Sequence, residues 1–117
     1  MKYMLLFWVD EAAAATADED AAMMIAVKSW VEDMTEREVS RSGGALRSAG
    51  EAKIVRVRDG EVLVSDGPFA ETKEQIGGYD VVECQDLDAA LAVAAGHPLA
   101  RTAQVEVRPF WDAPWDR

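Results

Sequence analysis

The segment Asp66-Gly67-Pro68-Phe69 contains the carboxylate of this chain that is best placed for chemistry. An aspartate at the rim of a cleft can act as a general base or bind a polar group of a ligand. An aspartate that precedes Gly-Pro also accepts hydrogen bonds from the amides of its own turn, and this structural role is the commoner one. Asp66 is therefore a candidate catalytic residue, with a turn-stabilising role as the alternative. Phe69 is expected to anchor the loop by burying its ring.

The polar residues that follow this loop could line the mouth of the same cleft. Thr72 and Lys73 lie between Glu71 and Glu74. Together with Phe69 they are candidate ligand-binding residues. The alternative is a short solvated helix with the Thr72 hydroxyl near its start, and this alternative is favoured.

His97 is the only histidine of the chain and lies between Gly96 and Pro98. A protonated imidazole there would interact favourably with the carboxyl end of the preceding helix. If His97 met Asp66 in a dimer, the two could form an acid-base pair, although their spacing does not show that they meet. His97 is thus the second candidate catalytic residue, with a solvent-facing helix-end role as the alternative.

Tyr79 follows two glycines at the start of a predicted strand. Its hydroxyl could reach a ligand, and the alternative is a half-buried ring in the core. Arg56, Arg58 and Arg108 could bind a carboxylate, but arginines at such strand positions more often contact solvent and discourage edge pairing. Tyr79 therefore joins the candidate ligand-binding residues.

The overall charge excludes several classes of partner. Asp and Glu number 22 against 12 Lys and Arg, giving a formal charge of −10 and a sequence pI near 4.4. Nucleic acid and anionic membranes need a basic surface, so neither is an expected partner.

The few cysteine and histidine residues indicate the cellular compartment and the ligands available to a metal. Cys84 has no second cysteine with which to form a disulfide, and His97 alone gives no set of zinc ligands. The apolar run 3–9 stops at Asp10 and Glu11, which is too short for a membrane span and unlike a signal peptide. We expect a reduced, cytoplasmic protein with no metal and no other cofactor.

With 117 residues, of which half are hydrophobic, the chain is long enough for one domain. We place this domain at residues 1–110, followed by a Trp/Pro tail at 111–117. The run 3–9 is predicted to be a buried strand. A helix is expected over about 17–42, because apolar residues from Met23 to Met34 recur at helical spacing. Thr16 and Glu19 can form its capping box, and Gly43-Gly44 is expected to end it.

Asp59-Gly60 indicates a two-residue hairpin turn of type I′. This turn pairs Arg58 with Glu61, so one face of the hairpin is all valine: Val55, Val57, Val62 and Val64. The other face carries charged side chains. We expect the valine face to be covered.

The remaining elements are a strand over 77–84, a helix capped by Asp86, and a strand over 103–110. Two helices that each connect strands predict an α+β, ferredoxin-like protomer, with an antiparallel sheet and both helices on one face. The valine positions, with Val105 and Val107 among them, predict an apolar sheet face. A two-fold homodimer would cover that face.

The residues also resemble a known family. The run DGPFAETKEQIGGYDVVECQDLDAALAVAAGHP, residues 66–98, closely resembles the DGPF group of YCII-related proteins, and the opening KYMLLFWVDE and the late VEVRPF match the same family's ends. The resemblance implies a dimeric α+β barrel. It also implies a histidine near the start of the first helix, paired with an aspartate, but this chain has no histidine before position 97.

Two functions stay open on this reading. Related dimeric barrels include cofactor-free isomerases, lyases and dehydrochlorinases, so the chain could be a small-molecule enzyme that uses Asp66 and His97 as acid and base. Members of the group also accompany alternative sigma factors, which implies an accessory or regulatory protein that binds a small molecule in a cleft between sheet and helices. The missing first-helix histidine favours the binding role.

Overall fold

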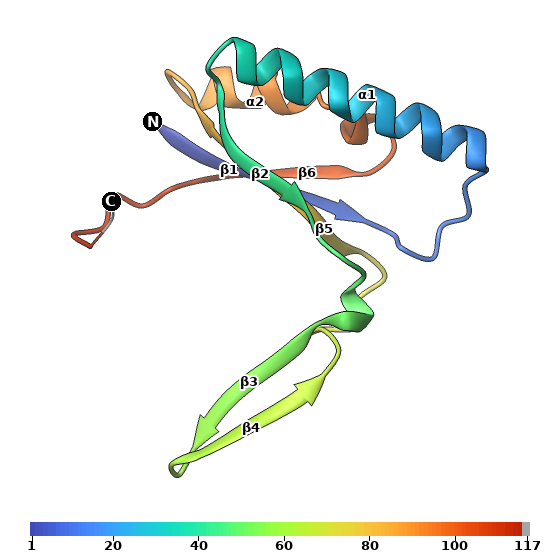
Figure 1. The fold of residues 1–117 in the computed structure, drawn as a ribbon. Coiled ribbons are helices and arrows are strands. Elements are labelled where there is room, and N and C mark those ends of the chain that lie inside the picture. The colour runs from blue at the N-terminus through green and yellow to red at the C-terminus, as the bar shows by residue number, and fades with distance from the viewer. Residues whose placement is uncertain (116–117) are drawn as a thin grey trace.

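The computed structural model describes residues 1–115 and contains one four-stranded antiparallel sheet with two helices (Figure 1). The strands of the sheet are β1 (Lys2–Val9), β2 (Ser40–Ala45), β5 (Gln75–Glu83) and β6 (Gln104–Pro109), in the order β2-β5-β1-β6. Helix α1 (Ala17–Glu36) connects β1 to β2, and α2 (Leu87–Ala95) connects β5 to β6. This is the ferredoxin-like arrangement that the sequence predicts.

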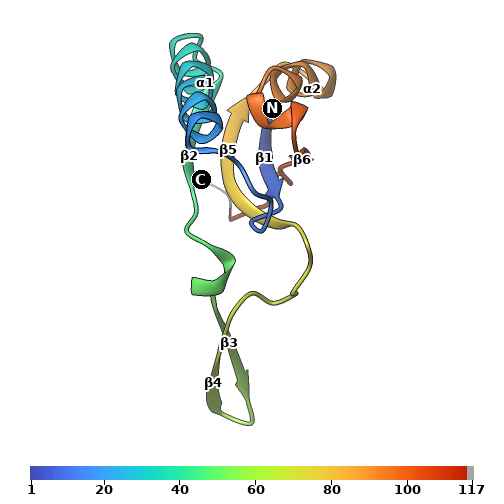
Figure 2. The same ribbon diagram turned by 90° about the vertical axis from the view of Figure 1, so that its right-hand side faces the viewer.

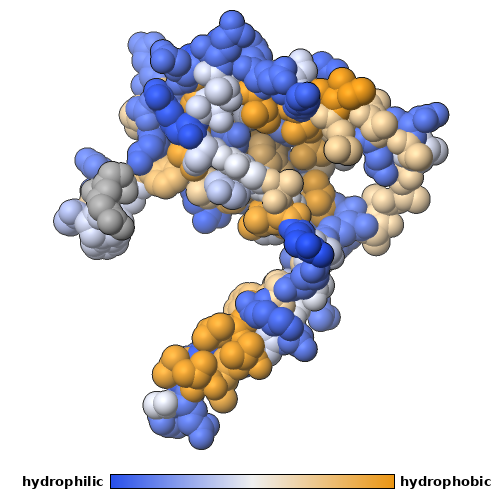
Figure 3. All heavy atoms as spheres, viewed as in Figure 1, coloured by the Kyte–Doolittle hydropathy of each residue, from blue (hydrophilic) through white to orange (hydrophobic). Residues whose placement is uncertain are grey.

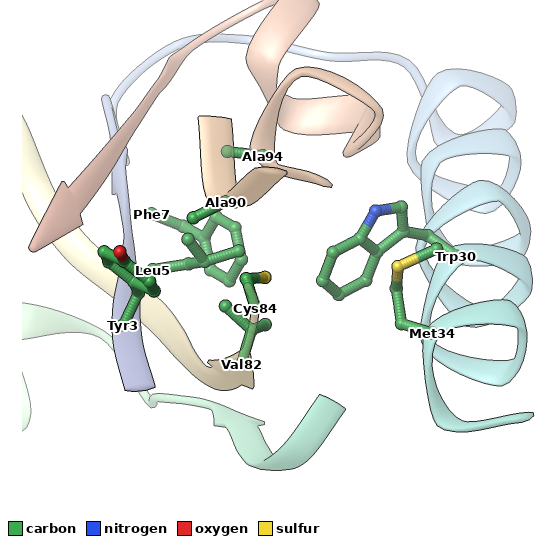
Figure 4. Close-up of a cluster of buried hydrophobic side chains, with 9 residues drawn as sticks. All are labelled: Tyr3, Leu5, Phe7, Trp30, Met34, Val82, Cys84, Ala90 and Ala94. Atoms are coloured by element: carbon green, nitrogen blue, oxygen red, sulfur yellow. The ribbon is translucent and has the colours of Figure 1, made fainter. Parts of the chain in front are cut away.

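Both helices cover the same face of the sheet (Figure 2). The core between these layers contains side chains from β1, β5 and both helices (Figure 4). Its members are Tyr3, Leu5, Phe7, Val82, Cys84, Trp30, Met34, Ala90 and Ala94. The side chains of β1 and β5 alternate between this core and the opposite, open face.

Helix α1 begins as predicted and ends earlier. Thr16 and Glu19 form the capping box. The helix stops at Glu36, because Glu38 adopts a left-handed conformation with φ of 61°. The expectation that the helix continues to 42 and ends at Gly43-Gly44 is wrong. Those glycines belong to β2, whose sequence SRSGGA lacks the β-branched residues that mark a strand.

The predicted hairpin forms with the expected register. Strands β3 (Lys53–Arg58) and β4 (Glu61–Asp66) pair Val57 with Val62 and Val55 with Val64. Asp59 and Gly60 have φ of 50° and 78°, as a type I′ turn requires. Arg58 donates to its neighbour's carbonyl, Val57 O, at 3.0 Å.

This hairpin forms a separate two-stranded sheet, which we call the arm (residues 53–66), and it projects away from the rest of the protein (Figures 1 and 2). Two short 3₁₀ helices, η1 (Ala49–Glu51) before the arm and η2 (Pro98–Arg101) after α2, complete the described elements. The arm raises the radius of gyration to 16.4 Å, against about 13 Å for a compact chain of this length. Within one protomer the valine face is therefore not covered.

The sequence suggested that Val105 and Val107 lie on one face with the arm valines, but in the structure they do not. They pair with Phe7 and Leu5 on the helix side of the sheet and pack against the core. The open face of the sheet has Met4, Leu6, Tyr79 and Val81 at its centre, with Glu106 and Arg108 on its outer strand. Outside the core, the arm and this open face thus both carry apolar side chains.

In the predicted tail, Trp111 and Trp115 stack edge to face with their rings 5.2 Å apart, and the tail's last two residues, 116–117, lie outside the described residues. No helix among residues 1–115 is both long enough and apolar enough to cross a membrane.

Candidate functional site

A cavity of about 520 Å³ lies between α1 and the sheet. Its walls come from five parts of the chain: Phe7 and Val9 of β1; Val27, Trp30, Val31 and Thr35 of α1; Ser40–Ala45 of β2; residues 77–80 of β5; and His97 and Leu99 after α2. Cavities of this size are typical of small-molecule sites. Two buried titratable side chains, Asp80 and His97, line it.

Asp80 is a carboxyl group in the middle of strand β5. It occupies an inward position between Gly78 and Val82, so strand alternation directs it toward the helices. Only 5% of the residue is exposed. Ser40 of β2 donates a hydrogen bond to Asp80 Oδ1 at 2.8 Å. Burial raises the pKa of the Asp80 carboxyl, and the bond from Ser40 opposes this shift only in part.

Gly43 makes room for that carboxyl. A β-carbon on Gly43 would lie 2.6 Å from Asp80 Oδ2 and 2.8 Å from the Tyr79 carbonyl oxygen. Any side chain there would collide with both. The glycine that the sequence assigned to a helix end therefore permits the close approach of β2 to the buried acid.

His97 lies at the end of the cavity formed by the segment after α2. Its ring stacks on Phe7 with centroids 4.2 Å apart and meets the edge of Trp30 at 4.7 Å. The residue is 2% exposed, and burial lowers the pKa of the imidazole to about 4. His97 is therefore neutral at pH 7 and faces the protein interior, so the predicted solvent-facing cation at the helix end is wrong.

Asp80 and His97 each have one polar atom with no partner among residues 1–115. His97 Nδ1 accepts a hydrogen bond from the Leu99 amide at 3.0 Å, whereas Nε2 has no bond to any of residues 1–115. Asp80 Oδ2 is likewise without a donor among them. Over the same residues, no buried side-chain nitrogen or oxygen is both sealed from solvent and unbonded. Both atoms must therefore be accessible, and we infer that they open onto the cavity which their residues line.

Asp66 lies elsewhere, at the base of the arm. Its side chain is 83% exposed and forms an ion pair with Lys53 across the two strands. No hydrogen bond from an amide of its own turn reaches the carboxylate among residues 1–115, so the predicted turn-stabilising contact is absent. Asp66 and His97 do not line the same cavity within one protomer. The catalytic role of Asp66 stays a prediction.

The other candidates cluster near the root of the arm. A second cavity, of about 660 Å³, is lined by Phe69 and Thr72 together with Trp8 and Ile76. Phe69 is 87% exposed, so the expectation that its ring is buried is wrong. Lys73 lies 3.9 Å from Asp10 in an ion pair.

The segment that holds these residues is a loop and not the short helix suggested as an alternative. The Gln75 amide donates to the Ala70 carbonyl at 2.8 Å and to the Thr72 carbonyl at 3.2 Å. The Thr72 hydroxyl donates to the Glu74 carbonyl. The loop is thus held by its own backbone acceptors, and its hydroxyl group is already used.

Tyr79 borders the first cavity through its backbone. Its carbonyl oxygen lies against Gly43, while alternation along β5 directs the ring to the open face, beside Leu6. The ring and the Asp80 carboxyl therefore lie on opposite faces of the sheet. A ligand role for the Tyr79 hydroxyl stays a prediction.

Sequence reasoning missed Asp80. The signal was present: an acid stands in the run Gly78-Tyr79-Asp80-Val81-Val82, at a position whose neighbours two residues away are inward-facing. A charged residue at an inward strand position is rarely buried without a reason. The Asp66-Gly67-Pro68-Phe69 motif favoured the loop that precedes this strand over the strand itself.

Comparison with known proteins identifies the family. The sequence pattern of the YCII-related domain matches residues 1–115. The chain belongs to the YCII-related family. It is also similar to the uncharacterized protein R00369 of Rhizobium meliloti (strain 1021), with 34% identity over 114 residues that cover 94% of this chain and 92% of the relative. In this YCII-related domain the buried titratable groups that line the cavity are Asp80 of β5 and His97 of the segment after α2.

Proposed function

We propose that this YCII-related domain binds a small molecule in the cavity beneath α1 and acts as a cytoplasmic, accessory or regulatory protein. The observation that carries the proposal is the pair of buried polar groups, Asp80 and His97, in an otherwise largely apolar cavity. Asp80 Oδ2 and His97 Nε2 are accessible and have no partner among residues 1–115, so both can bond to a ligand in the cavity.

A regulatory role requires only that the cavity binds a small molecule, and it needs no catalytic residue. Resemblance to the DGPF group suggests a setting beside an alternative sigma factor, in which a bound small molecule would be the signal. Helix α1 contributes Val27, Trp30, Val31 and Thr35 to the cavity wall. A ligand in the cavity would therefore pack directly against α1 and could change the position of this helix.

We further propose that the protein is a homodimer. The four arm valines are between 58% and 66% exposed, and hydrophobic side chains gather along the arm (Figure 3). A two-stranded hairpin without packing is only marginally stable in water. The arm carries three basic and three acidic residues, so the net charge of −10 belongs entirely to the rest of the chain. Contact through the arm would therefore bring two acidic copies together at their least repulsive part.

A cofactor-free enzyme of the isomerase or lyase type is the second candidate. The same two groups support it, because a carboxyl with a raised pKa and a neutral imidazole facing one cavity can exchange protons with a ligand. Asp80 then takes the acid-base role predicted for Asp66, unless the dimer brings Asp66 to the partner's cavity.

Native mass spectrometry of the protein purified from its own cells tests both parts. We expect twice the protomer mass of 12.8 kDa, plus a bound molecule. In a Val27→Trp variant, which fills the cavity from α1, the bound molecule should be lost. Met24→Trp, on the solvent side of the same helix, is the matched control and should retain it. A molecule retained in both variants would overturn the site, and a monomer would overturn the dimer.

A further inference from the structure

The hydrogen-bonding state of His97 limits what the cavity can recognise. Its Nδ1 accepts the Leu99 amide proton at 3.0 Å, so in the neutral ring the proton must be on Nε2. Nε2 has no acceptor among residues 1–115 and is the atom that remains accessible. His97 therefore presents an N–H donor to the cavity.

The Asp80 carboxyl has the corresponding arrangement. Ser40 donates to Oδ1, whereas Oδ2 lies against Gly43 and has no donor among residues 1–115, although it is accessible. The residue is 5% exposed, and its donor among residues 1–115 is the neutral Ser40 hydroxyl. A carboxyl buried without a cationic partner favours its uncharged form, and burial raises its pKa in the same direction. In that form Oδ1 serves as the acceptor for Ser40 and Oδ2 carries a proton that it can donate.

The rest of the cavity disfavours a charged ligand. Its walls include Phe7, Val9, Val27, Trp30 and Leu99, and the chain carries a net charge of −10. Moving an anion from water into such a site is costly unless a cation compensates it. Arg41 also lines the cavity, which makes a carboxylate the competing ligand class that the experiment must separate.

We propose that the cavity takes a neutral, largely apolar molecule whose carbonyl or equivalent acceptor oxygen is held by Asp80 Oδ2 and His97 Nε2. The proposal deepens the proposed function and rests on it. It makes Asp80 and His97 the residues that determine ligand specificity. It also gives a role to Asp80 Oδ2 and His97 Nε2, neither of which has a partner among residues 1–115.

Three bicyclic probes of similar shape test the proposal by titration calorimetry at pH 7.5. α-Tetralone carries a ketone, tetralin lacks it, and tetralin carboxylate replaces it with an anion. We expect α-tetralone to bind at least about tenfold more tightly than either of the others, because two buried donors hold its oxygen and each hydrogen bond is worth about 1 to 1.5 kcal/mol. Equal affinity for the ketone and the hydrocarbon, or tighter binding of the carboxylate, would overturn this ligand class.

Variants assign the preference to its residues. Asp80→Leu should reduce the ketone preference at least about fivefold while tetralin still binds, because one of the two donors is lost and the leucine keeps the site apolar. Asp80→Asn keeps both a donor and an acceptor and should retain the preference. Asp88→Asn, at an exposed position of α2, is the control and should leave the ketone preference unchanged.

Failure of the ligand class and failure of the proposed binding function give different results. If all three probes bind equally and Val27→Trp abolishes their binding, the site stands and the ligand class is wrong. If none binds, or if Val27→Trp leaves binding unchanged, the proposed function itself is wrong. A long-range nitrogen spectrum of the single histidine provides an independent check, since a proton on Nδ1 at pH 7.5 would contradict the donor role of Nε2.

Discussion

Gly43 and Asp80 face each other across strands β2 and β5 with no space for a side chain between them: a β-carbon on Gly43 would lie 2.6 Å from Asp80 Oδ2. The same β-carbon would meet the Tyr79 carbonyl oxygen at 2.8 Å. Backbone cannot move aside as the end of a flexible side chain can. The close approach of the two strands and the position of the buried acid therefore depend on one glycine.

Gly43→Ala should destabilise the protein by about 1 to 3 kcal/mol, because overpacking forces strands β2 and β5 to shift. Gly44→Ala is the matched control, since a β-carbon there has no atom within 4 Å. It should change the free energy of unfolding by less than about 1 kcal/mol. Chemical denaturation of both variants measures the difference. Equal losses would show that Gly43 does not hold the strands at this spacing.

Asp80→Asn should stabilise the unliganded protein at neutral pH. The pKa of Asp80 is raised by burial, so the folded protein holds the proton more tightly than the unfolded chain does. The stability that this provides is present at acid pH and is lost as pH rises through the folded pKa. Asparagine removes that loss and can still accept the bond from Ser40. Melting temperatures at pH 7.5 and pH 4 should therefore show a gain that shrinks on acidification, and a loss at pH 7.5 would contradict the shift.

His97 should make the protein less stable in acid. Its folded pKa of about 4 lies below the unfolded value of about 6.5, so the unfolded chain binds the proton first as pH falls. Between pH 7.5 and pH 5 this costs about 2 kcal/mol of folding free energy. The other titratable or charged residues that line the cavity are Arg41, Tyr79 and Asp80, and α1 contributes none.

The His97→Gln variant isolates this effect. Glutamine lacks the titration, so unfolding free energies at the two pH values should differ by about 2 kcal/mol less than in the parent protein. The variant will also lose the stacking on Phe7, which lowers its stability at both pH values. An unchanged pH dependence would mean that the imidazole titrates normally and is not buried.

The sequence predicted the elements with local signals and missed those defined by contacts between strands. The capping box at Thr16, the turn at Asp59-Gly60 and the cap at Asp86 depend on residues close in the chain, and all three form. Strand β2 has no such signal. It forms because its backbone pairs with β5 and because Gly43 allows the two strands to approach closely.

The candidate site was partly predictable for the same reason. His97 was chosen as the only histidine, and the structure places it in a cavity. The local pattern indicates the inward position of Asp80 on its strand. It does not reveal the partner Ser40, which lies forty residues earlier in the chain. The DGPF loop attracted attention through its unusual composition, but its Asp66 pairs with Lys53 at the root of the arm.

Val62→Lys should weaken the proposed dimer at least about tenfold, because it places a charge in the valine face of the arm. Leu63→Lys makes the same change one residue later, on the opposite face of the same strand, and should have little effect. Sedimentation at micromolar concentration measures both. A monomeric parent protein, or equal weakening by the two variants, would show that the valine face makes no contact between copies.

The central claim is that the cavity beneath α1 is the ligand site, and the single histidine offers the most direct measurement of it. His97 gives the one imidazole Cε1–H signal of the chain in a carbon-proton spectrum, so its assignment is unambiguous. On titration with α-tetralone we expect this signal to shift and saturate in the parent protein and in Met24→Trp, and to stay in place in Val27→Trp. A signal that does not move in the parent protein at saturating probe, or that moves equally in Val27→Trp, would contradict the account.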